Sequence, residues 1–184
     1  MKLNNKKSGF TLAEVLVTLM IIGVIAAMTI PSLMQSTAQQ EYKAAFKKAV
    51  SMLNQAVTLN YALDGEDGTD FTGDGFFDLM TKRLNIMSSV PTNKELYTAD
   101  GMWFSTTEPA SANGTKLTVS SAGACAVDDT ETVCSVVYVD VNGSKGPNAW
   151  TEGTNKVKDI FAVAIYPQKA LPDGDELREI LYSK

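Results

Sequence analysis

A single carboxylate, Glu14, lies inside an otherwise apolar stretch near the start of this 184-residue chain. The stretch runs from Leu12 to Leu33, with the sequence LAEVLVTLMIIGVIAAMTIPSL. A run of about 20 apolar residues is long enough to cross the hydrocarbon core of a bilayer. A charged carboxylate at mid-membrane costs about 3 kcal/mol on insertion scales. Glu14 therefore needs a partner that neutralises it.

A small pair of residues, Ser8-Gly9, stands immediately before the apolar stretch. An ordinary secretory signal peptide has its small-residue cleavage site after the apolar region. If the chain is cut between Gly9 and Phe10, Glu14 lies one helical turn from a new amino group. That amine, with a reference pKa near 8, is largely cationic at neutral pH. It can pair with Glu14 in the same subunit or in a neighbouring one, where the pair would set the register between packed helices.

The run from Gly9 to Leu19, GFTLAEVLVTL, and the apolar residues after it resemble the processing and methylation motif of type IV prepilins and type II secretion pseudopilins. The resemblance implies cleavage after Gly9 by a prepilin peptidase and methylation of the Phe10 amine by the same enzyme. It also implies that Glu14 acts in filament assembly, with other pilin or pseudopilin subunits and an inner-membrane assembly platform as partners. The alternative is a plain signal anchor in which the glutamate is accidental.

Gly23 and Pro31 lie within the same apolar segment. A proline inside a helix removes one backbone hydrogen bond and favours a kink. In the family that the motif resembles, such residues mark where the helix bends or unwinds during assembly. The simpler interpretation is that Pro31 ends the membrane span.

Three lysines, Lys2, Lys6 and Lys7, precede the apolar segment and predict that the N-terminus stays in the cytoplasm. The chain is then a single-pass protein of the bacterial cytoplasmic membrane, in contact with lipid, with its C-terminal part outside the cytoplasm. From there the resemblance implies a filament in the periplasm or at the cell surface. We expect a leader at 1–9, a membrane or filament-core helix at 10–35, and an amphipathic helix with a globular head at 36–184.

The helix is expected to continue beyond the apolar segment. Apolar residues recur every three or four positions at Tyr42, Ala45, Phe46, Ala49, Leu53, Ala56, Val57 and Tyr61. A helix from Phe10 to about Ala62 would be roughly 80 Å long. Its second half has one apolar face, which must pack against the rest of the head.

The remainder predicts an α+β head in which this helix packs on a small antiparallel sheet, the pilin-like arrangement. Helical spacing predicts a short helix over Phe76–Met87. Runs rich in β-branched and aromatic residues, separated by turn sequences such as Asn142-Gly143, predict a sheet of three or four strands. These runs are Met102–Ser105, Leu117–Ser120, Val133–Val141 and Ile160–Tyr166.

The two cysteines, Cys125 and Cys134, lack the CxxC spacing of a metal site. If the head lies outside the cytoplasm, a disulfide is favoured that closes the turn into a strand. Two reduced thiols are the alternative.

Two acidic segments raise the question of calcium. The loop 64–75 fits the calcium-loop template poorly, because Thr72 replaces a usual ligand and Thr81 stands where a bidentate glutamate belongs. A solvated acidic loop is favoured, with a loose calcium site as the alternative. The segment from Asp140 to Asn148, with Asp159 further on, resembles a pattern of pilin-like proteins that share this N-terminus. Asp140, Asn142 and Asn148 are weak calcium candidates, and folding of the turn is the favoured role for them. We expect no other cofactor.

Composition argues against several functions. The chain contains no histidine, which removes the commonest general base and zinc ligand, and we expect no enzymatic activity. Its net charge of −5 and its acidic head argue against direct binding to nucleic acid. Two functions follow. The first is a structural subunit of a type IV pilus or type II secretion-type filament, and the second is a membrane-anchored extracytoplasmic binding domain that does not polymerise.

Overall fold

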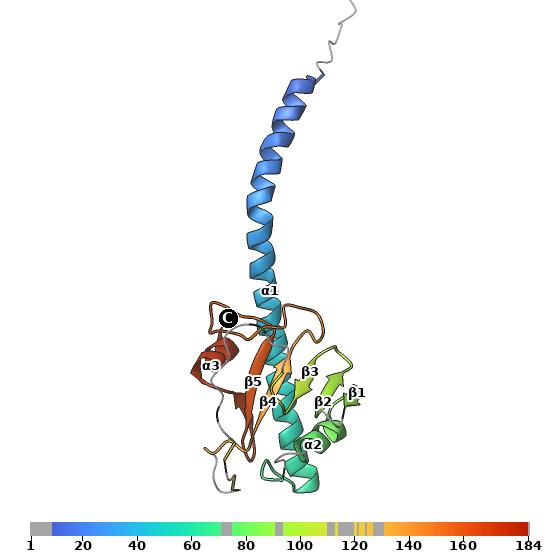
Figure 1. The fold of residues 1–184 in the computed structure, drawn as a ribbon, viewed down its shortest axis with the longest axis vertical. Helices are drawn as coiled ribbons and strands as arrows, with labels where there is room; N and C mark the ends of the chain where they lie inside the picture. The colour runs from blue at the N-terminus through green and yellow to red at the C-terminus, as the bar shows by residue number, and fades with distance from the viewer. Residues whose placement is uncertain are drawn as a thin grey trace, which may run out of the picture. The chain divides into compact units, whose positions relative to one another are not determined.

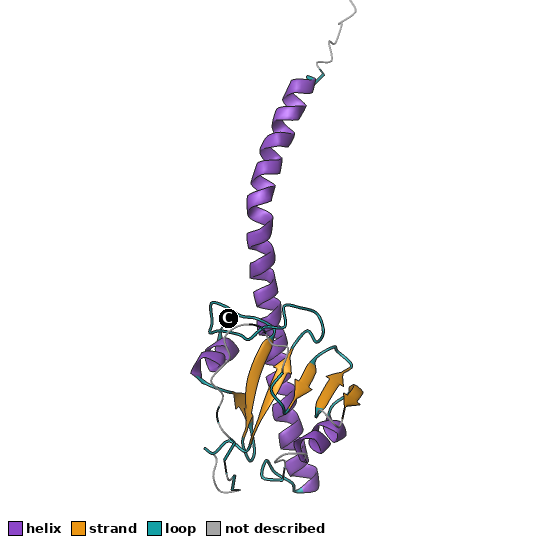
Figure 2. Cartoon of the chain, viewed as in Figure 1, coloured by secondary structure: helices purple, strands orange, loops and turns teal. Residues whose placement is uncertain are grey.

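A computed structural model describes residues 9–70, 75–90, 94–109, 113, 120, 122–123, 125–126 and 131–183 (Figure 1). The chain divides into two compact units, Met1–Ala38 and Gln39–Lys184. Within the described residues there are three helices and six strands (Figure 2). The helices are α1 (Leu12–Asp64), α2 (Gly75–Arg83) and α3 (Asp175–Tyr182). The strands are β1 (Ile86–Val90), β2 (Glu95–Thr98), β3 (Trp103–Ser105), β4 (Ser135–Asp140), β5 (Ile160–Ile165) and β6 (Ala170–Pro172).

Helix α1 has 53 residues, and both of its ends lie within two residues of the prediction. The helix ends at Asp64. The next residue, Gly65, has a φ of 73°, a left-handed conformation that glycine adopts without steric cost. The Gly65 N–H donates to the Tyr61 carbonyl at 3.2 Å, which closes the last turn. The long predicted helix is therefore confirmed.

The second half of α1 is amphipathic, as expected. Its buried residues are Phe46, Ala49, Val50, Leu53, Ala56, Val57 and Asn60, spaced three or four apart along one face. The Phe46 ring stacks on Phe161 of β5 with ring centroids 4.1 Å apart. This half of the helix therefore packs on the sheet through an apolar core, and the predicted α+β arrangement, consistent with a pilin fold, is confirmed.

The sheet is an antiparallel meander in which each strand pairs with the next along the chain. Side chains alternate between its two faces. Leu96, Phe104, Val139 and Phe161 are register partners across four strands and share the face that carries the Phe46 contact. Tyr97, Trp103, Asp140 and Ile160 are register partners on the opposite face.

The predicted number of strands was too low, because the described residues alone contain six. Predicted strands at Met102–Ser105, Val133–Val141 and Ile160–Tyr166 correspond to β3, β4 and β5. The missed strands are short and carry weak signals: β2 begins with Glu95 and β6 ends with Pro172, a residue confined to sheet edges. The strand predicted at Leu117–Ser120 lies outside the described residues except for Ser120.

The helix predicted over Phe76–Met87 was too long, since α2 ends at Arg83 and Met87 belongs to β1. The Asn85 carbonyl accepts a hydrogen bond from the Ala99 N–H at 2.9 Å, so this residue already belongs to the hairpin. Tertiary pairing thus overrides the helical spacing. Helix α3 was not predicted from the sequence. It buries Leu177 and Ile180. The Ser183 carbonyl, directly after α3, accepts a hydrogen bond from Lys47 Nζ of α1.

Candidate processing and assembly site

Helix α1 begins with a capping box formed by Thr11 and Glu14. The Thr11 hydroxyl accepts from the Glu14 N–H at 3.3 Å, and Glu14 Oε2 accepts from the Thr11 N–H at 2.8 Å. The same oxygen accepts from the Thr11 hydroxyl at 2.8 Å. This reciprocal pattern satisfies N–H groups that a helix start otherwise leaves unpaired. Thr11 is a residue to which the sequence analysis gave no role, although the Thr-x-x-Glu spacing predicts it.

The two residues at the expected cleavage site precede the helix. Gly9 and Phe10 have no regular secondary structure, and the Phe10 side chain is 90% exposed. A Cβ atom built on Gly9 would meet no other atom within 4 Å. Packing within the described chain therefore gives no reason for glycine at this position, and the bond after it lies in accessible backbone.

The first half of α1 exposes its apolar side chains. Leu16, Ile22 and Met28 are 58%, 61% and 75% exposed. The helix is long and apolar enough to cross a membrane, with a mean hydropathy of 2.3 in its most apolar window. The hydroxyls of Thr18, Thr29, Ser36 and Thr37 each donate to a carbonyl three or four residues earlier in the helix. Polar groups paired in this way suit an apolar surrounding, where no water replaces a missing bond.

Gly23 and Pro31 both lie inside α1, which continues through them to Asp64. A Cβ atom at Gly23 would meet nothing within 4 Å, so the chain's own packing does not require glycine there. Pro31 cannot donate a backbone hydrogen bond to the preceding turn. The predicted role of these residues in bending or unwinding the helix stays a prediction.

Residues 4–30 match the family model described as the prokaryotic N-terminal methylation motif. The N-terminus carries this methylation motif. The match is consistent with a type IV pilin-like protein, and it includes Gly9, Phe10, Thr11, Glu14 and Gly23, with Pro31 one residue beyond it. No curated protein and no solved structure matches the chain significantly. The methylation motif thus accounts for the site at the start of α1 and leaves the head without a comparison.

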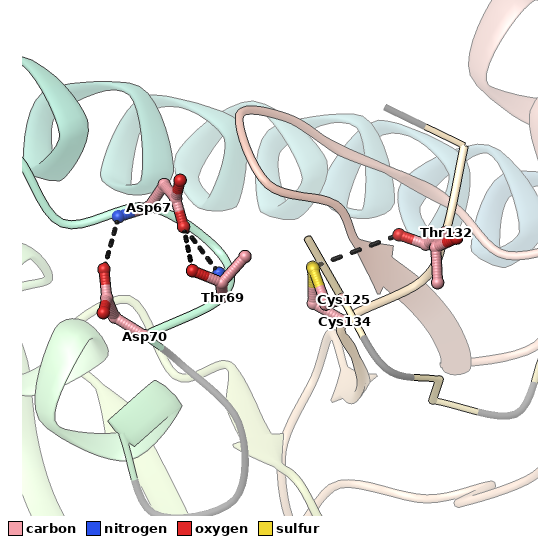
Figure 3. The surroundings of a disulfide bond; sticks show 6 residues. All are labelled: Asp67, Thr69, Asp70, Cys125, Thr132 and Cys134. Carbon is pink, nitrogen blue, oxygen red and sulfur yellow. Dashed lines mark hydrogen bonds between the residues drawn. A yellow bond between two sulfur atoms is a disulfide. The ribbon is translucent and has the colours of Figure 1, made fainter. Parts of the chain in front are cut away.

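The head contains the predicted disulfide, between Cys125 and Cys134, with the two Cα atoms 4.9 Å apart (Figure 3). Cys134 is buried, and its N–H donates to the Ile165 carbonyl at 2.8 Å, which extends the pairing of β4 with β5. Close to the disulfide, the Gly123 N–H donates to the Val133 carbonyl at 2.9 Å. The disulfide therefore fastens the segment before β4 to the start of that strand.

The acidic loop after α1 is less solvated than predicted. Asp67 is 4% exposed and accepts from the Thr69 N–H at 2.8 Å, while its own N–H donates to Asp70 Oδ2 at 2.9 Å (Figure 3). The Gly68 N–H donates to the Pro167 carbonyl at 2.7 Å, which holds the turn against the segment after β5. The prediction of a solvated loop was wrong for this turn, because its carboxylates fold the turn. Asp74 lies outside the described residues.

The second calcium candidate lies where β4 ends. Asp140 accepts from the Asn142 N–H at 3.1 Å, and the Asn142 amide donates to the Gly146 carbonyl at 3.4 Å. Asp159 accepts from the N–H groups of Asn148 and Ala149, both at 2.8 Å. These bonds fold the turn, the favoured interpretation. Among the described residues no three His, Cys, Asp or Glu side chains form a metal-holding group, and calcium binding stays a prediction.

Proposed function

We propose that this protein is a structural subunit of a type IV pilus or a type II secretion-type filament. The observation that supports it most is the methylation motif at residues 4–30, with Glu14 capping the helix directly after the expected cleavage site. A prepilin peptidase would cut after Gly9 and methylate the Phe10 amine. The head would then lie outside the cytoplasmic membrane, with the leader of residues 1–9 removed.

The exposed apolar half of α1 supports the two states that this proposal needs. Before assembly its side chains would contact lipid, and in the filament they would contact the helices of other subunits. Both surroundings are apolar, so transfer between them leaves little change in hydrophobic free energy. Glu14 would add a polar contribution to the free energy of this transfer, because it would exchange its bonds with Thr11 for a charge pair with the amine of a neighbouring subunit.

Replacement of Glu14 by Ala tests this function. The variant is expected to be inserted and cut after Gly9 but to lose assembly into sheared filaments, because the charge pair between subunits is gone. Glu41→Ala is the matched control, since Glu41 is an exposed glutamate on the same helix. Mass spectrometry of the mature wild-type chain should show Phe10 as its methylated first residue.

Two results would contradict the proposal. A mature species that still begins at Met1 would show that no peptidase acts here. Filaments that form normally with Glu14→Ala, or a head that works without any polymer, would favour the membrane-anchored binding domain instead.

A further inference from the structure

A pocket of about 330 Å³ opens on the sheet face opposite the Phe46 contact. Its floor is the row of register partners Tyr97, Trp103, Asp140 and Ile160 from four adjacent strands. Trp103, Asp140 and Ile160 are buried, whereas Tyr97 is 36% exposed and stands at the open side. The pocket size falls in the range of sites that take small ligands or single side chains.

The wall of the pocket is the connection from β4 to β5, which the fold holds in place. Asp159 fixes it through the N–H groups of Asn148 and Ala149. Trp150 packs edge-on against Tyr138 on the same sheet face, with ring centroids 5.6 Å apart. Gly143 has a φ of 65°, and a Cβ atom there would lie 2.6 Å from the Gly101 carbonyl oxygen. The pocket is therefore pre-formed.

Three side chains that line this pocket carry hydrogen-bond acceptors. Glu95 and Asp140 contribute carboxylates from β2 and β4. Asn148 also lines the pocket, and its Oδ1 atom is buried with no hydrogen-bond partner in the described structure. A buried acceptor without a donor costs about 1–3 kcal/mol, so a ligand that donates to it gains that energy. Of the described residues that line the pocket, none is positively charged.

Electrostatics support the same conclusion. Burial raises the pKa of Asp140 to about 7, against the bond from the Asn142 N–H and with the help of Asp159. Burial also raises the pKa of Tyr97, and the charges of Glu95 and Asp140 add to that rise. Glu95 therefore supplies a negative charge beside the Tyr97 ring. Asp140, which is about half ionised near neutral pH, adds to it, and the described lining offers no counter-charge.

We propose that this pocket binds a primary alkylammonium group, such as the side chain of a lysine from another polypeptide. Two aromatic residues, Tyr97 and Trp103, line the pocket and offer apolar surface to the alkyl chain. A ring that turns its face to the ammonium would add a cation–π contact. The acceptors come from three separate elements, β2, β4 and the β4–β5 connection. Such an arrangement suits a compact ammonium with three N–H donors better than a planar guanidinium.

Titration of the full-length chain in detergent with N-acetyl-lysine methylamide tests this site. The indole N–H resonance of Trp103 should shift in a saturable way, and the neutral probe N-acetyl-norleucine methylamide, which keeps the four-carbon chain and lacks the ammonium group, should leave it unchanged. Glu95→Gln should weaken binding about tenfold, because one charge-assisted contact is lost. Tyr97→Leu should weaken it about two- to fivefold through the lost ring.

Matched controls keep the result interpretable. Glu179→Gln makes the same change on the exposed face of α3, and Tyr182→Ala removes a ring that is 76% exposed. Both should bind as the wild type does. Equal binding of the norleucine probe, unchanged affinity in Glu95→Gln, or saturation of the Trp103 shift by CaCl₂ without competition from the lysine probe would each overturn the proposal. The test needs no filament, so it stands apart from the proposed assembly function.

Discussion

The two halves of α1 have the same backbone structure and opposite surfaces. In the unit Met1–Ala38, Leu16 is 58% exposed and Ile22 is 61% exposed. In the unit Gln39–Lys184, Phe46 and Leu53 on the same helix are fully buried. The apolar face of the second half is buried within the chain, whereas the apolar side chains of the first half are exposed. One helix thus combines a half whose apolar face is buried in the head with a half that leaves its apolar surface exposed.

The two units also differ in the sequence distance that their side-chain hydrogen bonds span. Polar side chains in the first half of α1 pair with residues three or four positions away. In the head, the side-chain oxygen Oδ1 of Asn54 accepts from the Ala170 N–H across 116 residues of sequence. The first unit therefore satisfies its polar groups locally, as an apolar surrounding requires, while the head depends on distant parts of the chain.

The largest expected effect comes from a matched pair of leucines on α1. Leu53→Ala should lower the free energy of unfolding of the head by about 2–5 kcal/mol, because it leaves a cavity in a closed core. Leu16→Ala should leave it unchanged, since that side chain is mostly exposed and lies outside the compact unit of the head. Urea unfolding of the full chain in detergent, followed by tryptophan fluorescence, reports on the head alone because Trp103 and Trp150 both lie there. Equal effects of the two changes would refute the contrast.

A matched pair of glycines should give a smaller effect. At Gly68 a Cβ atom would lie 2.4 Å from the Tyr166 carbonyl oxygen, so Gly68→Ala should cost about 1–3 kcal/mol of head stability. At Gly23 the added atom meets nothing, and alanine is expected to strengthen the isolated helix by about 0.5–1 kcal/mol. The same unfolding experiment measures the first change, and helix content by circular dichroism measures the second. A stable Gly68→Ala head would show that the acidic turn is not packed as described.

The smallest effect concerns an ion pair of the head between Lys48 and Asp100, 2.6 Å apart. Burial tends to raise the pKa of Asp100, but the bonds from Lys48 and Thr98 outweigh it and hold the pKa below its usual value. The pair is partly exposed, so Lys48→Met should cost only about 0–1 kcal/mol at neutral pH.

The pH dependence of this pair follows from the lowered pKa. Its contribution is fully present above the unfolded pKa of Asp100, near 3.9, and disappears as the pH falls through the folded value. The difference between wild type and Lys48→Met should therefore shrink below about pH 4. Lys145→Met, at an exposed lysine, is the control and should show no such change. A difference that grows in acid would contradict the assignment.

The sequence predicted the parts of the fold that depend on local pattern. Periodicity located α1 within two residues at each end, and β-branched runs located β3, β4 and β5. It missed β1, β2 and β6, because a strand of three to five residues gains much of its stability from its neighbours. It extended α2 to Met87, because spacing alone does not show that Asn85 already pairs with Ala99.

The sequence alone predicted the processing site, which lies within the matched methylation motif. Ser8-Gly9 before the apolar stretch and Glu14 within it are local features, read in an extended or helical chain without any tertiary contact. Tertiary structure decided what the head presents. Glu95 is far in sequence from Asp140 and Asn148, and the pairing of the strands brings all three to one pocket. The physical reason is the sequence distance between the residues involved. Those of the N-terminal site lie within about one helical turn of each other, whereas those of the pocket lie on segments that only folding brings together.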